Sequence, residues 1–180
     1  MRAWCTQTLI LLALLLAGCA SIPLSTALRF ANWDARDLAR VDPAQVRVRV
    51  SVDEGIGIDV DGTRLGMSLI DDAGVVHAAE LPLTLLASRS GTRPGGWFRS
   101  DIPVDTVVLA LTPDGADKLV GMRQLVLSGQ PREFSLKVWA KLAEVPPETR
   151  AVRFWADVRL GEDEPYVTVI DGAELEMVRE

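Results

Sequence analysis

The clearest regularity in this chain is an alternation of apolar and polar residues that begins at Val46. Every second position is a valine, namely Val46, Val48, Val50 and Val52. Arginine or serine stands between them. Side chains of a β-strand point alternately to opposite faces, so this period of two predicts a strand with one buried face. Strands of this kind are typical of antiparallel sheets.

Similar short apolar runs cover most of the remaining chain. They occupy positions 56–60, 65–70, 75–86, 97–99 and 104–111, and later 134–142, 152–160, 166–170 and the vicinity of 175–177. Turn signals separate several of them, at Asp61-Gly62, 72–74 and 94–96. Pro146-Pro147 marks a hairpin between the two long late alternations. Many short strands with frequent turns predict an antiparallel, sandwich-like sheet in a mainly-β (α+β) domain.

One segment follows helical rules instead. Thr112 suits the N-cap, Pro113 suits the first helical position, and Gly129 ends the pattern. The apolar residues expected on its packed side are Ala116, Leu119, Val120, Val126 and Leu127. We expect this single helix to pack against the sheet. Nearer the N-terminus, residues 28–41 mix apolar and charged positions and predict one or two short helical turns.

The first residues have the pattern of an export signal. Arg2 precedes an apolar run from Leu9 to Ala17, which is well short of the ~20 residues that span a bilayer. The following sequence, Leu16-Ala17-Gly18-Cys19, resembles the lipobox of bacterial lipoproteins. The resemblance implies that residues 1–18 are a cleaved signal peptide and that Cys19 carries a diacylglyceryl group and an N-acyl chain. Several fatty chains hold a protein durably on a membrane.

The same resemblance implies a location. Ala20 follows the modified cysteine, and lipoproteins of enteric-type bacteria are usually retained in the inner membrane only when Asp stands there. We therefore expect a lipid anchor at the periplasmic face of the outer membrane. Cys5 lies in the leader, so the mature chain keeps Cys19 alone and forms no internal disulfide. We expect residues 19–45 to form a short tether with helical turns and residues 46–180 to form one β-rich periplasmic domain.

The charge of the mature chain excludes some partners. Removal of the leader leaves 18 of the 19 basic residues against all 25 acidic ones, a formal net charge of −7. Nucleic-acid binding is disfavoured, because neutralising phosphates requires a basic surface. Electrostatic docking on an anionic membrane is disfavoured for the same reason. The membrane is therefore expected to be a partner through the lipid on Cys19.

Two tryptophans of the late alternations are expected on the face opposite the core. If the even-numbered residues point inward, Lys137, Trp139, Arg153 and Trp155 point outward. A hairpin register in which opposed residue numbers add up to 294 places Trp139 across from Trp155, and Lys137 across from Asp157. Exposed aromatic rings flanked by cations form a stacking platform for a sugar or a docking point for a protein. Alternatively, another part of the fold covers both rings.

Familiar catalytic and metal-binding motifs are missing from the sequence. His77 is the only histidine and the mature chain has no free thiol, which disfavours zinc and a Cys-His pair. No Gly-x-Ser-x-Gly sequence presents a nucleophile. Residues 59–63 resemble part of a calcium loop, but Gly57 and Ser68 occupy its first and last ligand positions. We interpret Asp61-Gly62 as a hairpin turn.

Residues 89–97 combine cations with glycines and can be interpreted either as an anion-binding loop or as an ordinary surface connection. The Gly-Lys-Ser/Thr ending of a phosphate-binding loop is missing, which favours the connection.

We therefore expect a protein that is not an enzyme and takes no cofactor. The preferred interpretation is an interaction or structural module of the cell envelope with a protein partner. The alternative is a binding module for an envelope glycan or lipid that uses Trp139 and Trp155 with Lys137 and Arg153. A hydrolase is the third interpretation, because the sequence cannot show whether two carboxylates meet in space.

Overall fold

The computed structural model describes residues 35–95, 100–129 and 133–177. The elements of this part are α3 (Ala35–Arg40), η1 (Pro43–Gln45), β1 (Arg47–Asp53), β2 (Gly57–Ile70), β3 (Val76–Arg93), β4 (Ile102–Leu111), α4 (Pro113–Ser128), β5 (Glu133–Ala143), β6 (Ala151–Arg159) and β7 (Val167–Glu176).

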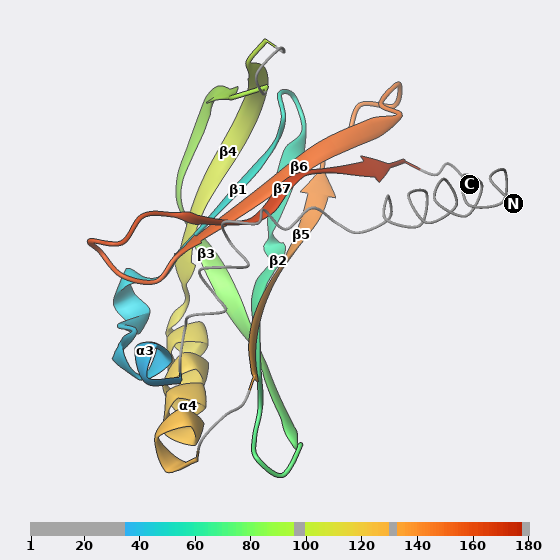
Figure 1. The fold of residues 1–180 in the computed structure, drawn as a ribbon. Helices are drawn as coiled ribbons and strands as arrows, with labels where there is room; N and C mark the ends of the chain where they lie inside the picture. The colour runs from blue at the N-terminus through green and yellow to red at the C-terminus, as the bar shows by residue number, and fades with distance from the viewer. Residues whose placement is uncertain (1–34, 96–99, 130–132, 178–180) are drawn as a thin grey trace, which may run out of the picture.

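The strands form one antiparallel sheet in the order β5-β2-β3-β4-β1-β6-β7. The long β3 joins its two halves, because its first part, up to Pro82, pairs with β2 and its second part, from Leu83, pairs with β4. A bulge at Leu85–Ala87 interrupts the pairing with β4. The edge strands β5 and β7 approach each other, so the sheet curves back on itself (Figure 1). The predicted mainly-β antiparallel fold with a packed helix is confirmed. One continuous curved sheet forms the sandwich-like arrangement.

The alternating patterns fix which side of each strand is buried. The even-numbered valines of β1 and the even-numbered residues of β6 are buried in one hydrophobic core, which the alternation predicted. Leu65, Leu81 and Leu109 bring β2, β3 and β4 into the same core and are fully buried. Burial of side chains of this size contributes about 1.5–3 kcal/mol each. This shared core spans both halves of the sheet.

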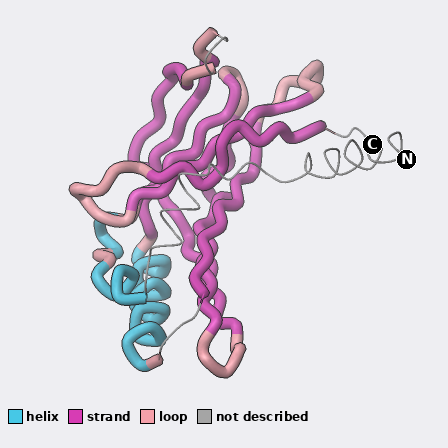
Figure 2. Tube along the Cα trace, in the orientation of Figure 1, coloured by secondary structure: helices cyan, strands magenta, loops and turns pink. Residues whose placement is uncertain are grey.

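Helix α4 begins and ends where the sequence predicts. The Thr112 hydroxyl accepts a hydrogen bond from the Gly115 amide at 3.1 Å, and Gly129 follows the last turn. The helix packs on β3 and α3, and both helices lie on one side of the strands (Figure 2). Its buried face differs from the expected one, because Met122 is buried while Leu127 is 70% exposed.

Gly115 allows the start of α4 to approach the sheet closely. A Cβ at this position would lie 2.6 Å from the backbone oxygen of Pro82 on β3. The helix therefore rests almost directly on the backbone of the strand.

In the N-terminal segment, α3 confirms the predicted helical turns for the residues described, and Leu38 and Val41 are buried in the core. Cys19 and residues 1–18 lie outside the described residues, as does the predicted run at 97–99.

Two local predictions are wrong. Asp61-Gly62 does not turn a hairpin, because β2 continues through it with a register irregularity between Asp59 and Arg64. The Asp59 side chain accepts from the Gly62 amide at 3.1 Å, and its backbone oxygen accepts from Thr63 Oγ1 at 2.8 Å. These bonds hold a bulge. Residues 89–93 do not form a surface connection either, because β3 extends to Arg93.

The predicted pairing of the last two long strands is also wrong. Within the described residues, β5 pairs with β2 alone and lies at one edge of the sheet, whereas β6 lies between β1 and β7 near the other edge. The alternation correctly assigned the inward residues of both strands, but β5 pairs with β2 and β6 pairs with β1 and β7. Pro146-Pro147 therefore lies in a connection between two strands that do not pair with each other. The predicted runs at 166–170 and 175–177 join into the single strand β7, in which Gly172 has a φ of +63°.

Candidate functional site

The four residues proposed as one surface lie at two separate places. Trp139 and Lys137 are on β5, where Trp139 pairs with Arg64 of β2. Trp155 and Arg153 are on β6, beside β1 and β7. The cross-strand pair of tryptophans does not form, because β5 and β6 are not neighbours in the sheet.

Trp155 is 4% exposed, and its ring packs inside the fold. The guanidinium carbons of Arg93 and Arg153 lie 5.7 and 6.0 Å from the centre of its ring. On β7, a Cβ added to Gly172 would lie 3.2 Å from the indole nitrogen. Arg153 is held in turn by Asp53, with 2.9 Å between its Nε and a carboxylate oxygen. This ring is therefore removed from the set of candidate binding residues.

Asp157 does not face Lys137 as expected. It lies across from Arg49 of β1, and its side chain is only 1% exposed. Its Oδ2 accepts from Arg49 at 2.9 Å and also from Arg93, and its Oδ1 accepts from Thr168 at 2.7 Å. Burial raises the pKa of Asp157, but the hydrogen bonds from Arg93, Thr168 and Arg49 outweigh this effect and hold the pKa below its ordinary value.

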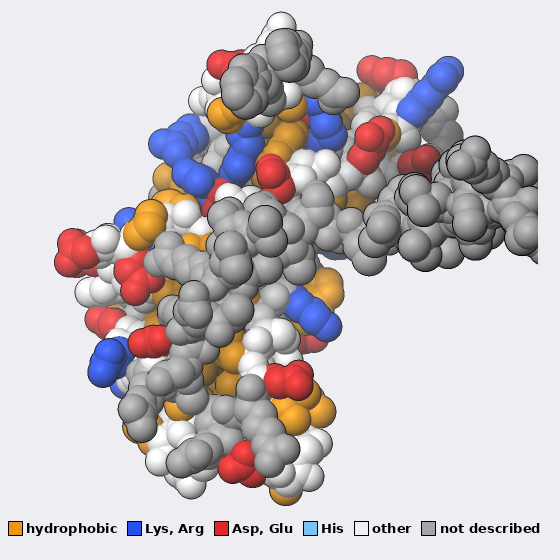
Figure 3. Space-filling model, in the orientation of Figure 1, with side chains coloured by type: hydrophobic (Ala, Val, Ile, Leu, Met, Phe, Trp, Pro, Cys, Tyr) orange, Lys and Arg blue, Asp and Glu red, His pale blue; other side chains and the backbone are white. Residues whose placement is uncertain are grey.

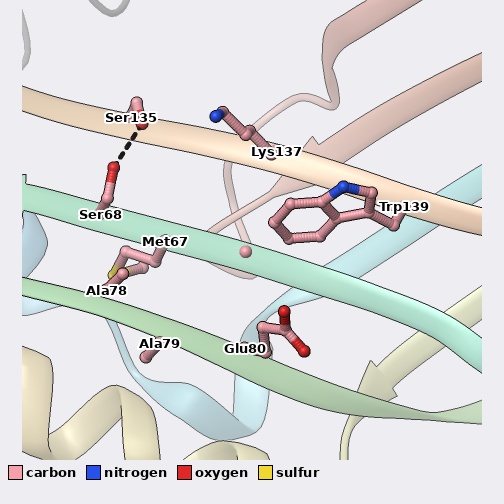
Figure 4. A pocket seen from close by; sticks show the side chains of 9 residues that line it. Met67, Ser68, Ala78, Ala79, Glu80, Ser135, Lys137 and Trp139 are labelled. Atoms are coloured by element: carbon pink, nitrogen blue, oxygen red, sulfur yellow. Dashed lines mark hydrogen bonds between the residues drawn. The ribbon is translucent and has the colours of Figure 1, made fainter.

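Trp139, in contrast, is 47% exposed. Its ring lies over Gly66 of the neighbouring strand, where any Cβ would overlap the six-membered part of the indole. A glycine inside a strand often marks such a close approach. The ring therefore covers the β2 backbone with one face, while much of it remains open to solvent (Figure 4).

A shallow cavity of about 300 Å³ extends from this ring across three strands. We call it the Trp139 groove, and its lining residues are Gly66, Met67, Ser68, Ala78, Ala79, Glu80, Ser135, Lys137 and Trp139. Its volume is at the lower end of the range for small-molecule pockets, about 300–1,000 Å³. The groove combines one aromatic face, a floor of small side chains and a rim of polar groups.

The polar groups come from consecutive rows of the sheet. Lys137 of β5 and Glu80 of β3 are both paired with Gly66, so an ammonium and a carboxylate flank the ring from opposite sides (Figure 4). In the next row, the hydroxyls of Ser68 and Ser135 are 2.7 Å apart and hydrogen-bonded. Both charged side chains are exposed, and within the described part of the chain neither has an ion-pair partner. They are free to bond to a ligand.

An ion pair between β5 and β2 lies beside the groove. Lys141 Nζ is 3.0 Å from Asp59 of the β2 bulge. Hydrogen bonds from Lys141 and from the Gly62 amide hold the pKa of Asp59 below its usual value. This pair joins β5 to the bulge next to Trp139 and supports the shape of the strand that carries the ring.

His77 has a structural role at the turn between β2 and β3. Its Nε2 lies 3.0 Å from Asp71, which also accepts bonds from the amides of Ala73 and Val75. These contacts, with that of His77 the strongest, hold the pKa of Asp71 below its usual value. No three His, Cys, Asp or Glu side chains within 35–95, 100–129 and 133–177 are arranged to hold a metal ion. In the same residues, no helix is long and apolar enough to cross a membrane.

Sequence reasoning identified Trp139 and Lys137 but missed Gly66, Ser68 and Glu80. The available signal was the glycine between Leu65 and Met67, inside a strand-like run. Its meaning depends on which strand pairs with it. Comparison of the chain with protein-family models, curated proteins and solved structures returns no match. Function is therefore inferred from the residues themselves.

Proposed function

We propose that this protein is a lipid-anchored, non-catalytic binding module of the bacterial cell envelope that holds a glycan in the Trp139 groove. The observation that carries the proposal is the exposed, flat indole of Trp139, fixed on Gly66 and surrounded by hydrogen-bonding side chains.

The chemistry of the groove suits a sugar ring. The C–H face of a pyranose is apolar and packs on an aromatic ring, while its hydroxyls at the rim need donors and acceptors. Lys137 supplies a donor, Glu80 an acceptor, and Ser68 and Ser135 supply groups that do both. The strands fix the backbone positions of these residues, and the contact with Gly66 seats the Trp139 ring before a ligand arrives, which reduces the entropy lost on binding.

The surroundings of Trp139 favour a glycan over a protein partner. A protein hot spot usually has an aromatic ring at the centre of a desolvated patch. The rim of this groove instead carries charged and hydroxylated side chains, namely Lys137, Glu80, Ser68 and Ser135. Of the exposed apolar side chains, Val76 lies two residues beyond Ala78, at the end of the groove away from Trp139. Leu85 and Leu86 lie in the second part of β3, and Leu127 lies on α4.

Membrane attachment rests on the leader and on Cys19. The lipobox-like sequence implies acylation of this residue, and the acidic composition makes electrostatic membrane attachment unfavourable. A Cys19→Ser variant is expected to leave the membrane fraction when envelopes are separated by ultracentrifugation. A variant that stays in the membrane fraction as wild type does would contradict the lipid anchor. This result would not bear on glycan binding, which is tested separately.

Glycan binding is tested by co-sedimentation of the full-length protein, in neutral detergent, with purified peptidoglycan sacculi. Trp139→Ala is expected to weaken binding by about tenfold, corresponding to the loss of about 1.4 kcal/mol of stacking. Trp139→Phe retains a flat ring and should keep most of the affinity. Lys118→Ala, on the distant α4, is the matched control and should bind like wild type.

Two results would contradict the proposal. One is wild-type protein that stays in the supernatant with sacculi and with isolated outer-membrane polysaccharide. The other is equal binding by a correctly folded Trp139→Ala variant, checked by far-UV circular dichroism. A protein cross-linked at this groove in intact envelopes would instead support the docking interpretation.

A further inference from the structure

A second cavity lies on the other half of the sheet and is built from arginines. It measures about 370 Å³ and is formed by β1, β4 and the last part of β3. Its lining residues are Arg49, Ser51, Arg89, Ser90, Gly91, Thr92, Arg93, Pro94, Val104 and Thr106. We call it the arginine pocket. Basic side chains gather over the upper strands in the space-filling view (Figure 3).

The arginine pocket carries a local excess of positive charge. Arg49 and Arg93 share one carboxylate, that of the buried Asp157. Arg89 is exposed, and no carboxylate within the described residues pairs with it. The three arginines of the pocket are therefore balanced by a single paired carboxylate, in a chain whose formal net charge is −6. The charge of this concave surface is opposite in sign to that of the whole protein.

Two of the three guanidinium groups are held in fixed orientations. Arg49 lies 4.3 Å from the centre of the Tyr166 ring, and Arg93 lies over Trp155. Arg49 bonds to Asp157 through Nε, so its two terminal nitrogens keep their hydrogens available. The side chains of Arg49 and Arg93 remain 26% and 17% exposed, which lets a solute reach them. Such pre-oriented forks match the oxygens of an oxyanion.

We propose that the arginine pocket binds a phosphate group, either free or on a lipid headgroup. A carboxylate offers two oxygens in one plane, whereas the oxygens of a phosphate are arranged tetrahedrally and accept donors from several directions. Arg49 and Arg89 approach from different strands, with β4 between them. This site is separate from the Trp139 groove and does not depend on glycan binding.

The proposal is tested by isothermal titration calorimetry of the full-length protein in neutral detergent at low ionic strength, with inorganic phosphate as the probe. We expect saturable binding that weakens with added NaCl. Arg89→Gln should weaken it at least tenfold, and it should fold normally because the Arg89 side chain is exposed. Arg40→Gln removes one exposed charge from α3 and should leave phosphate binding unchanged.

Further probes identify the source of the phosphate. Soluble dihexanoyl phosphatidylglycerol that binds more tightly than inorganic phosphate, with dihexanoyl phosphatidylcholine as the zwitterionic comparison, would indicate a lipid headgroup. Equal or tighter binding of inorganic phosphate would indicate a free phosphate ligand. Absence of binding for every phosphate probe would overturn the proposal. Equal affinity of Arg89→Gln and wild type, or acetate binding as tight as phosphate binding, would overturn it too.

Discussion

Replacement of Asp157 by alanine is expected to destabilise the protein by about 3 kcal/mol. The carboxylate is buried and accepts hydrogen bonds from Arg49, Arg93 and Thr168, and so connects β1, β3 and β7 through β6. Its removal leaves two guanidinium groups side by side without a counter-charge. It also leaves the Thr168 hydroxyl without this acceptor.

The magnitude follows from the burial of the partners. Loss of one member of a buried ion pair costs about 3–5 kcal/mol, because a charge stays buried and unpaired. The two arginine side chains keep partial access to water, at 26% and 17% exposure, so the lower end of this range applies. An exposed pair would contribute only about 0–1 kcal/mol.

The assay is urea denaturation of the full-length protein followed by circular dichroism. Asp157→Ala should lower the unfolding midpoint with little change in the denaturant slope. Lys118→Ala is the control, because it breaks the exposed Lys118–Asp114 pair on α4 and should cost less than about 0.5 kcal/mol. Similar losses in the two variants would refute the assignment of Asp157 to a buried network.

The pH dependence provides a second check. Asp157 has a folded-state pKa below its ordinary value, so its ionised form stabilises the protein above the unfolded-state pKa of about 3.9. This contribution is lost as the pH falls through the lower folded-state pKa. The stability difference between wild type and Asp157→Asn should therefore be full at neutral pH and shrink in acid. A difference that grows in acid would contradict the sign of the shift.

The remaining predictions concern glycines. Gly115→Ala should destabilise the protein by about 1–3 kcal/mol, because its Cβ meets a backbone oxygen. Gly121→Ala, on the same helix with open space around it, should stabilise by about 0.5–1 kcal/mol. Equal effects in thermal unfolding would contradict the close approach at Gly115. Gly66→Ala should displace the Trp139 ring, so iodide should quench tryptophan fluorescence more strongly and binding to sacculi should fall. Unchanged quenching would show that the ring does not rest on this glycine.

The sequence predicted the strands and their buried sides because both follow from local patterning. The alternation in β1, β5 and β6 assigns each side chain to a face whatever strand lies next to it. It carries no information on which strands pair, and the hairpin expected across Pro146-Pro147 failed for this reason. Similarly, β3 extends over 89–93 although these residues lack apolar alternation, because β4 supplies the pairing.

The candidate site was partly predictable for the same reason. Trp139 and Trp155 were both assigned to the polar face, but only the pairing decides whether a ring is covered. Trp155 lies against Arg93 of β3 and Gly172 of β7, as well as Arg153 of its own strand, while Trp139 lies on an edge strand. The buried state of Asp157 likewise depends on residues of three strands. Such long-range contacts are not visible in a single alternating segment.

The most direct test of the glycan proposal is photo-crosslinking in living cells. A photo-reactive phenylalanine derivative placed at position 137, beside Trp139, samples what occupies the groove. The same group at position 40 on α3 is the control. We predict a heterogeneous adduct from position 137 that collapses to a sharp band after treatment with a glycan-cleaving muramidase. A discrete adduct that muramidase leaves unchanged and that mass spectrometry identifies as a second protein would contradict the proposal.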